Sequence, residues 1–255
     1  MSAEPFDDIE ERGPVRAHFA ADRADVETLR QLLAAGLSPD AEYDGTPVVW
    51  NGKTPLLTLC IAWHDDAGDR VGCFKLLRDA GANLEATDRL GRTPLHCAAT
   101  AGKPDLLSLL IQAGVNVEAV DRYANATALH DAASSSERGV VDCVELLLAA
   151  GADMDARDTS GRRPFDIALT DNCPRLFPLF LRAGAEVPTT MITRLSVPVP
   201  VTDPYMERVR NAGGFKKYEQ AHLARLTRSF EPKFPMLPKE LVRHVVGFWL
   251  HAGYY

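Results

Sequence analysis

Three groups of residues in this chain carry side chains that could do chemistry. His96 and His130 could act as catalytic bases or as metal ligands. The run His64-Asp65-Asp66 could bind a metal ion, but no second group of ligands follows it at a suitable spacing. The run Ser134-Ser135-Ser136 could supply a nucleophile, but the sequence around it has neither a G-x-S-x-G elbow nor a matching histidine–acid pair.

Carboxylate pairs and glycine-rich segments give no stronger signal. Asp153 and Asp155 lie in a polar connection, where acidic residues serve solubility, and Gly213-Gly214 is an isolated pair rather than a phosphate-binding loop. We therefore predict no catalytic residue, no metal site and no cofactor, and we expect that the chain is not an enzyme. The remote alternative is an enzyme with a site hidden in the C-terminal region.

The elements that position these side chains repeat along the chain. An Ala-Gly pair ends each of five apolar runs, and its glycines are Gly36, Gly81, Gly114, Gly151 and Gly184. The residues seven and four positions before each glycine are apolar in all five runs, which places them on one face of a helix. A glycine after such a run ends the helix because it adopts a left-handed conformation without strain.

A second motif opens each of the last four runs. It reads Thr54-Pro55, Thr93-Pro94, Thr127-Ala128 and Arg163-Pro164 in the successive units. Threonine can cap a helix and proline suits the first helical position, so the motif predicts a helix start. Each unit is therefore a short helix, a turn and a second helix, followed by an exposed polar connection. One such pair cannot bury its apolar face alone, so the units must stack.

The run Gly91 to Ala99, which reads G-R-T-P-L-H-C-A-A, resembles the ankyrin-repeat signature, and the unit length near 33 residues is similar as well. The resemblance implies an all-α solenoid of helix-turn-helix units with a C-terminal helical segment. It also implies that His96 and His130 support turns through hydrogen bonds, which we prefer to a catalytic or metal role. The residues with a structural role in the repeat are Thr54, Pro55, Thr93, Pro94, His96, Thr127, His130, Gly36, Gly81, Gly114, Gly151 and Gly184.

The repeats are predicted to cover residues 14–188, after an acidic segment at 1–13. The expected units are 14–45, 46–91, 92–125, 126–161 and 162–188. In the first unit Pro14-Val15-Arg16-Ala17-His18 replaces the signature, so this unit looks like a degenerate N-terminal cap. The fifth unit has Arg163 and Asp166 in place of threonine and histidine, and we expect it to close the stack.

The ankyrin resemblance implies a non-catalytic protein–protein interaction module. Such stacks bind through their exposed connections and concave face, and aromatic and arginine residues often dominate the binding energy of interfaces. The partner-binding candidates are therefore Trp50, Asn51, Arg89, Leu90, Arg92, Arg122 and Tyr123. For each of them, a surface position without a role is the alternative.

The pattern stops after residue 188. Residues 189–204 contain Val197-Pro198-Val199-Pro200-Val201, which cannot form a helix and predicts an extended linker. Residues 205–255 are expected to be helical, with a break near Gly213-Gly214. They form either a structural cap of the stack or a docking segment, and the candidate residues are Leu237, Pro238, Leu241, Val245, Phe248 and Trp249.

The docking alternative depends on a second resemblance. Leu237-Pro238-x-Glu240-Leu241, followed by Val245-Val246, is similar to the opening of an F-box and to the latter half of a SOCS box. Both families recruit ubiquitin-ligase adaptors. This resemblance implies a substrate-recognition subunit of a ubiquitin ligase, in which the repeats hold the substrate and the C-terminal segment recruits the adaptor.

Charge and composition limit the class of partner. Residues 1–188 carry 18 basic and 30 acidic residues, and residues 189–255 carry 10 and 5. The acidic repeats repel nucleic acid and membrane surfaces, and no apolar stretch is long enough to span a bilayer. We expect a protein partner, no nucleic acid, no membrane insertion and a monomer when unbound. The five scattered cysteines are typical of reduced thiols, so we expect an intracellular protein, cytoplasmic or nuclear.

Overall fold

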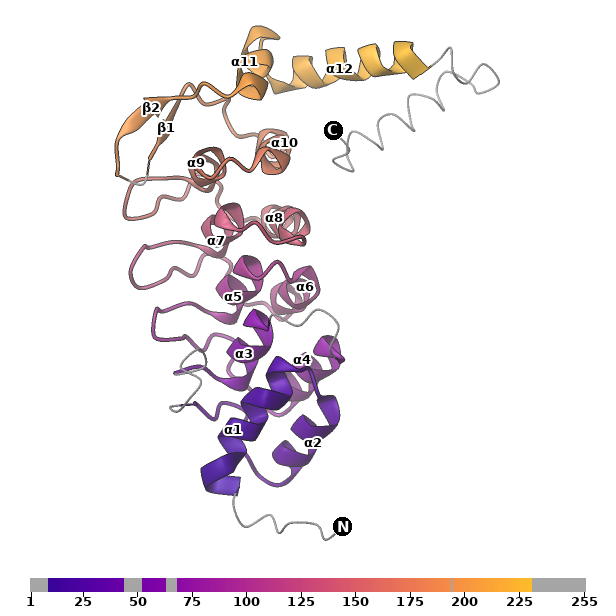
Figure 1. Ribbon diagram of the computed structural model, residues 1–255, viewed down its shortest axis with the longest axis vertical. Helices are drawn as coiled ribbons and strands as arrows, with labels where there is room; N and C mark the ends of the chain where they lie inside the picture. Colours follow the sequence, from indigo (N-terminus) through magenta and orange to yellow (C-terminus); the bar gives the residue numbers. More distant parts are fainter. Residues whose placement is uncertain (1–8, 44–51, 63–67, 194, 231–255) are drawn as a thin grey trace.

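A computed structural model of the protein describes residues 9–43, 52–62, 68–193 and 195–230. Over these residues the chain is a stack of helix pairs that follow one another in sequence order (Figure 1). The predicted all-α solenoid is confirmed, with one short two-stranded hairpin added near the C-terminal end of the described region.

Five helix pairs carry the repeats. The first helix of each pair lies next to the long connecting loops, and the second lies on the far side of the stack (Figure 1). The pairs are Ile9–Asp22 (α1) with Val26–Ala34 (α2), Pro55–Ile61 (α3) with Arg70–Asp79 (α4), Pro94–Thr100 (α5) with Pro104–Gln112 (α6), Ala128–Ser134 (α7) with Val140–Ala149 (α8), and Pro164–Thr170 (α9) with Phe177–Arg182 (α10), which follows the 3-10 turn Pro174–Leu176 (η3).

The helices begin and end where the sequence motifs place them. The Thr54 hydroxyl accepts a hydrogen bond from the Leu57 amide at 3.3 Å, and Thr93 and Thr127 form capping boxes with the histidines three residues later. Gly114, after α6, has a φ of +80°, a backbone conformation that side chains with a Cβ avoid. The motifs therefore act through ordinary helix capping.

One continuous apolar core runs through the stack. The α1, α3, α5, α7 and α9 helices contact one another in series, and so do α2, α4, α6 and α8. The ten residues seven and four positions before the repeated glycines are all buried: Leu29, Leu32, Phe74, Leu77, Leu107, Leu110, Val144, Leu147, Phe177 and Phe180. The predicted apolar face is thus the surface along which the units pack.

The first unit begins earlier than predicted. Helix α1 starts at Ile9, and Pro14 lies inside it rather than at its start. A proline in a helix removes one hydrogen-bond donor, but that loss affects only the carbonyl one turn earlier, so the helix can continue on both sides. Residues 9–13, which we assigned to the acidic N-terminal segment, belong to this helix.

Residues 189–204 are not an extended linker. They form a hairpin in which Thr190–Ile192 (β1) pairs antiparallel with Pro198–Pro200 (β2). The backbone groups that face the partner strand belong to odd-numbered residues. The Val201 amide donates to the Thr189 carbonyl at 2.9 Å, and the Thr193 amide donates to the Val197 carbonyl at 3.0 Å. Pro198 and Pro200 occupy the alternate positions, where a strand of this hairpin needs no amide hydrogen.

The described chain ends in a sixth, divergent helix pair, Pro204–Asn211 (α11) and Phe215–Phe230 (α12), separated at the predicted glycine break. Asp203 takes the place of the capping threonine and accepts hydrogen bonds from the Tyr205 and Met206 amides at 2.8 and 3.0 Å. Met206 and Val209 are fully buried in the common core, and Arg182 on α10 pairs with Glu219 on α12 at 3.1 Å. The fifth unit therefore does not close the stack.

Candidate functional site

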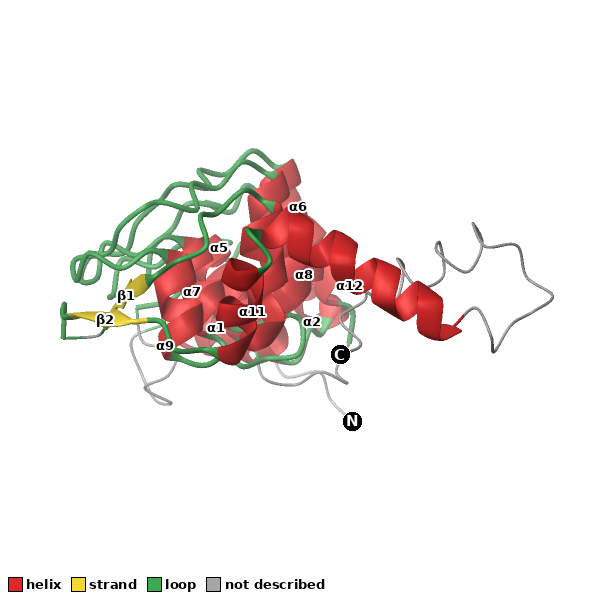
Figure 2. Ribbon diagram, turned by 90° about the horizontal axis from the view of Figure 1, so that it is seen from above, coloured by secondary structure: helices red, strands yellow, loops and turns green. Residues whose placement is uncertain are grey.

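The connections between successive units project from one edge of the stack (Figures 1 and 2). Three of them are described in full, and we call residues 82–93, 115–127 and 152–163 the third, fourth and fifth fingers. Four of the seven partner-binding candidates, Arg89, Leu90, Arg122 and Tyr123, lie at the turns of the third and fourth fingers.

A buried aspartate shapes the turn of the third finger. One oxygen of Asp88 accepts the amides of Leu90 and Arg92 at 2.9 and 3.0 Å. The other accepts the Nε and Nη2 groups of Arg92 at 3.1 and 2.8 Å. This buried carboxylate is therefore fully paired. Arg92, a predicted partner-binding residue, turns its guanidinium back into the finger instead of projecting outward.

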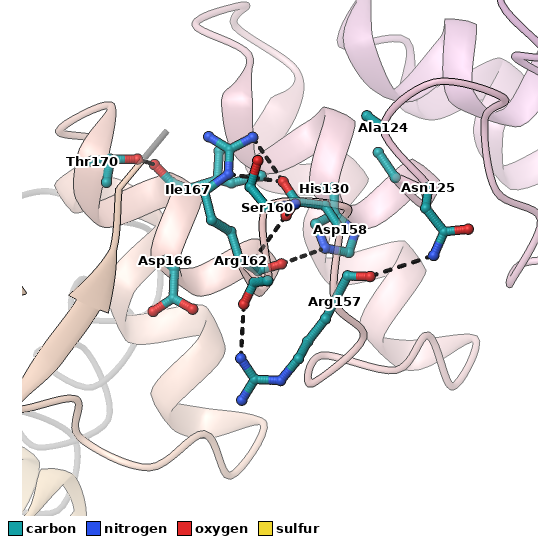
Figure 3. Close-up of polar contacts among 12 residues, drawn as sticks. Ala124, Asn125, His130, Arg157, Asp158, Ser160, Arg162, Asp166, Ile167 and Thr170 are labelled. Atoms are coloured by element: carbon teal, nitrogen blue, oxygen red, sulfur yellow. Dashed lines mark hydrogen bonds and ion pairs between the residues drawn. The ribbon is translucent and has the colours of Figure 1, made fainter. Parts of the chain in front are cut away.

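The fifth finger repeats this arrangement (Figure 3). Asp158 accepts the amides of Ser160 and Arg162, both at 2.8 Å, and pairs with the Arg162 guanidinium at 2.7 Å. Removing one member of a buried, hydrogen-bonded ion pair typically costs about 3–5 kcal/mol, because the other charge is left uncompensated. We call each of these buried aspartate–arginine pairs a clamp, and each clamp holds its turn in one conformation.

The fourth finger is one residue longer and keeps the turn without the arginine. Asp121 accepts the amides of Ala124 and Ala126 at 2.8 and 3.1 Å. Ala126 stands where the other fingers have their clamping arginine. Asn125 adopts the left-handed conformation, with a φ of +51°, which asparagine tolerates better than most residues.

His96 and His130 join each unit to the next finger. Nε2 of His96 lies 3.0 Å from the Ala126 carbonyl oxygen, and Nε2 of His130 lies 3.1 Å from that of Arg162 (Figure 3). A carbonyl can only accept, so Nε2 carries the hydrogen, and Nδ1 accepts the Thr93 or Thr127 amide. Burial lowers the pKa of both imidazoles and so favours this neutral form.

His18 plays the same part in the first unit, which sequence reasoning missed. Its Nε2 lies 2.9 Å from the Lys53 carbonyl oxygen, although Pro14-Val15-Arg16-Ala17 does not match the repeat signature. The available signal was the histidine itself, four residues after a proline. Two other units lack the histidine: Leu57 replaces it with a buried apolar side chain, and Asp166 replaces it with a carboxylate that pairs with Arg163.

Backbone hydrogen bonds lock neighbouring fingers together. The Arg122 amide donates to the Leu90 carbonyl at 2.9 Å, and the Thr159 amide donates to the Ala124 carbonyl at 2.7 Å. Gly91 has a φ of +80°, and a Cβ there would lie 2.7 Å from the Arg122 nitrogen, so only glycine permits this close approach. The finger turns are thus fixed relative to one another.

The exposed side chains at these turns are a mixture of apolar and basic groups. Tyr123 is 65% exposed and Leu90 is 45% exposed, and each follows an exposed arginine in sequence. We call Arg89, Leu90, Arg122 and Tyr123 the tip surface. Among the described residues, five of the six exposed large apolar side chains lie in the fingers or the hairpin: Leu90, Val120, Tyr123, Leu195 and Val197. The hairpin projects from the same edge as the fingers (Figures 1 and 2).

Several sequence candidates lie outside the described residues or are otherwise engaged. Trp50, Asn51, the run His64-Asp65-Asp66 and the C-terminal candidates at 237–249 are not described. The Ser134 hydroxyl donates to the Asp131 carbonyl at 2.9 Å, and the Ser135 hydroxyl donates to the Thr100 carbonyl at 2.8 Å. Within the described parts of the chain, no group of three histidine, cysteine or acidic side chains could hold a metal ion.

Asp131, the fourth residue of α7, was not singled out from the sequence. Its Oδ2 atom is buried without a hydrogen-bond partner. The pKa of this carboxyl is raised to about 7, chiefly by burial and also by the Asp121 and Asp88 carboxylates, against the lowering effect of the Arg92 guanidinium and the Thr100 hydroxyl. The position follows the histidine of the repeat, where the signature accepts any residue, so the motif gave no signal.

A sequence profile of the family described as Ankyrin repeats (3 copies) matches residues 17–121, 59–158 and 98–190. These matches together span well over half of the chain. The chain belongs to the ankyrin-repeat family. No helix within the described ranges is both long and apolar enough to cross a membrane.

The proteins to which this chain is similar carry different names. The chain is 36% identical over 164 residues to the zinc finger CCCH domain-containing protein 24 of Oryza sativa subsp. japonica, covering 58% of this chain and 21% of that protein. It is 32% identical over 189 residues to the B-cell lymphoma 3 protein homolog of Mus musculus, covering 72% and 39%. It is 33% identical over 118 residues to the nuclear factor NF-kappa-B p105 subunit of Gallus gallus, covering 45% and 12%. The match thus spans well under half the length of each of these relatives.

Asp131 makes the stability of this ankyrin stack depend on pH. The folded protein holds the Asp131 proton more tightly than the unfolded chain, so the folded state loses stability as the pH rises from about 4 to about 7. Asp131→Asn removes this penalty. We expect the variant to have a free energy of unfolding roughly 1–3 kcal/mol above that of the wild type at pH 8, and a much smaller difference at pH 4.5, both measured by urea unfolding.

Asp142→Asn on the exposed side of α8 is the matched control, and we expect it to leave the free energy of unfolding within about 0.5 kcal/mol of the wild type at both pH values. An Asp131→Asn variant that is no more stable than the wild type at pH 8 would show that the buried carboxyl carries no such penalty.

Proposed function

We propose that this ankyrin-repeat protein binds its partner through the tip surface and the adjoining first helices of the units, without catalysis. Ankyrin repeats are protein–protein interaction modules. The observation that carries the proposal is the exposure of Tyr123 and Leu90 on neighbouring fingers. The backbones of these fingers are joined by the hydrogen bond from the Arg122 amide to the Leu90 carbonyl at 2.9 Å. Burying an exposed aromatic side chain against a partner removes apolar surface from water, which favours binding.

The rigidity of the fingers supports this role. The Asp88 clamp holds the turn of the third finger, and the His96 bond to Ala126 holds the end of the fourth. A surface that is already ordered loses little conformational entropy on binding, so more of the contact energy appears as affinity. Arg92 contributes by holding the third finger, while Trp50 and Asn51 remain predicted contacts in the connection before Gly52.

Substitution of the exposed tip residues tests this proposal. We expect Tyr123→Ala to weaken binding of the partner by about 2 kcal/mol, or roughly 30-fold, as at the aromatic centre of an interface. Partners would be recovered by affinity purification of the full chain and identified by mass spectrometry, and affinities measured by calorimetry. The fold should be intact, with a melting temperature within about 2 °C of the wild type, because the removed ring is mostly exposed.

Arg138→Ala is the control, since Arg138 is exposed in the turn that joins α7 to α8 rather than in a finger. Partner recovery by this variant should match that of the wild type. Equal affinity of the Tyr123→Ala variant and the wild type for every recovered partner would rule out the tip surface.

We propose as the alternative that the chain is a substrate-recognition subunit of a ubiquitin ligase, with the C-terminal segment, residues 205–255, recruiting the adaptor. In the described part of that segment, Tyr205 of α11 packs against Phe177 and Glu219 of α12 pairs with Arg182, both on α10 of the fifth unit. The proposal is supported by the F-box-like and SOCS-box-like run at Leu237 to Val246, which lies outside the described residues.

Full-length protein with Leu241→Glu tests the adaptor proposal, because a charge on the apolar face of the predicted helix should abolish docking. We expect cullin adaptors to co-purify with the wild type and with a Lys239→Ala control, and to be lost from the Leu241→Glu variant. Wild-type protein that recovers its partner but no cullin adaptor would contradict the ligase role.

A further inference from the structure

The tip surface differs in charge from the chain that carries it. We propose that it recognises an acidic peptide segment of the partner that places an aromatic or branched apolar residue beside its carboxylates. This inference depends on the proposed function, because it specifies the chemistry of the ligand at the same surface.

The first reason is that the acidic groups of these turns point inward. The two carboxylate oxygens of Asp88 accept hydrogen bonds from two amides and from the Arg92 guanidinium. Asp121 accepts the amides of Ala124 and Ala126. Asp88 is thus paired within its own turn, and one oxygen of Asp121 is used in the same way, whereas Arg122 next to Asp121 is exposed.

The acidic residues lower on the fingers are also engaged within the protein. Glu85 accepts the Asn116 amide of the next finger at 2.6 Å, and Glu118 accepts the Asp153 amide at 2.9 Å. These bonds direct one oxygen of each carboxylate toward the next finger along the stack. A ligand at the turn of the fourth finger therefore contacts the exposed side chain of Arg122.

The second reason is the contrast between short-range and long-range charge. Residues 1–188 carry an excess of acidic over basic residues, 30 against 18, so the stack as a whole repels a large polyanion. Surface charges are screened over about 8 Å at physiological ionic strength, so a short segment with two or three carboxylates responds mainly to the nearest arginines. This combination favours an acidic peptide over nucleic acid or an anionic membrane.

The third reason is the arrangement of apolar groups among the arginines. Arg89 precedes Leu90, and Arg122 precedes Tyr123, on two fingers joined by the bond from the Arg122 amide to the Leu90 carbonyl. The exposed side chains of Arg122, Tyr123 and Leu90 are thus held in a fixed relation. An extended segment that places a carboxylate next to an aromatic or leucine side chain matches these three groups, since arginine binds carboxylates and tyrosine packs against apolar groups.

A display library of random twelve-residue peptides, selected on the immobilised full-length protein, tests the inference. We expect enrichment of peptides in which aspartate or glutamate adjoins an aromatic residue or leucine. A fluorescein-labelled peptide from this pool should bind at least tenfold more weakly to Arg122→Glu than to the wild type, by fluorescence polarisation. Its affinity should fall several-fold between 50 and 300 mM NaCl, as screening requires, and Arg138→Glu should leave it unchanged.

Neutral or basic selected peptides, or no enrichment, would overturn the inference, and so would an Arg122→Glu variant that binds as tightly as the wild type. Displacement of the labelled peptide by polyuridylic acid or phosphatidylserine vesicles, at lower concentration than the unlabelled peptide requires, would overturn it as well. Failure of the inference differs from failure of the proposed function. Non-acidic peptides that still lose affinity on Tyr123→Ala would leave the tip surface as the binding site, whereas insensitivity to both substitutions would remove it.

Discussion

The structure depends on one constraint: a connection that leaves the stack must satisfy its own backbone amides without a strand or helix to pair with. In the third and fifth fingers a single aspartate does this, with one oxygen accepting two amides of the turn and the other accepting a guanidinium. The carboxylates of Asp88 and Asp158 are almost fully buried, so each turn tolerates them only because every lone pair is used. The finger therefore exists in one conformation.

That constraint determines which side chains can bind a partner. The aspartate is directed inward in each finger, a clamping arginine pairs with it in the third and fifth fingers, and a histidine of the preceding unit fixes the end of the fourth and fifth. In the third and fourth fingers the two residues after the aspartate are exposed. In the third finger these are Arg89 and Leu90, and in the fourth they are Arg122 and Tyr123. The same hydrogen bonds that stabilise the fold thus select a basic and apolar edge on a chain that is acidic overall.

The repeated elements could be predicted from sequence because each depends on local chemistry: Thr-Pro starts a helix, Ala-Gly ends one, and the residues between them are buried in a periodic pattern. What could not be predicted depends on contacts between units or on register. Predicting the hairpin at 190–200 requires knowing the register, in which the backbone nitrogens of Pro198 and Pro200 face away from the partner strand. The role of His18 depends on a carbonyl 35 residues away, and Asp203 replaces threonine in a cap that the repeat signature does not describe. Arg92 could be recognised as important, but not as directed inward.

Amide hydrogen exchange in the free protein tests whether the fingers are ordered before a partner binds. We predict that the amides of Leu90, Arg92, Ser160 and Arg162 exchange roughly a hundredfold more slowly than in an unstructured peptide, since buried aspartates accept them. Exchange of these four amides at the rate of an unstructured peptide, with the helices still protected, would show that the fingers are not ordered in advance and would contradict the account.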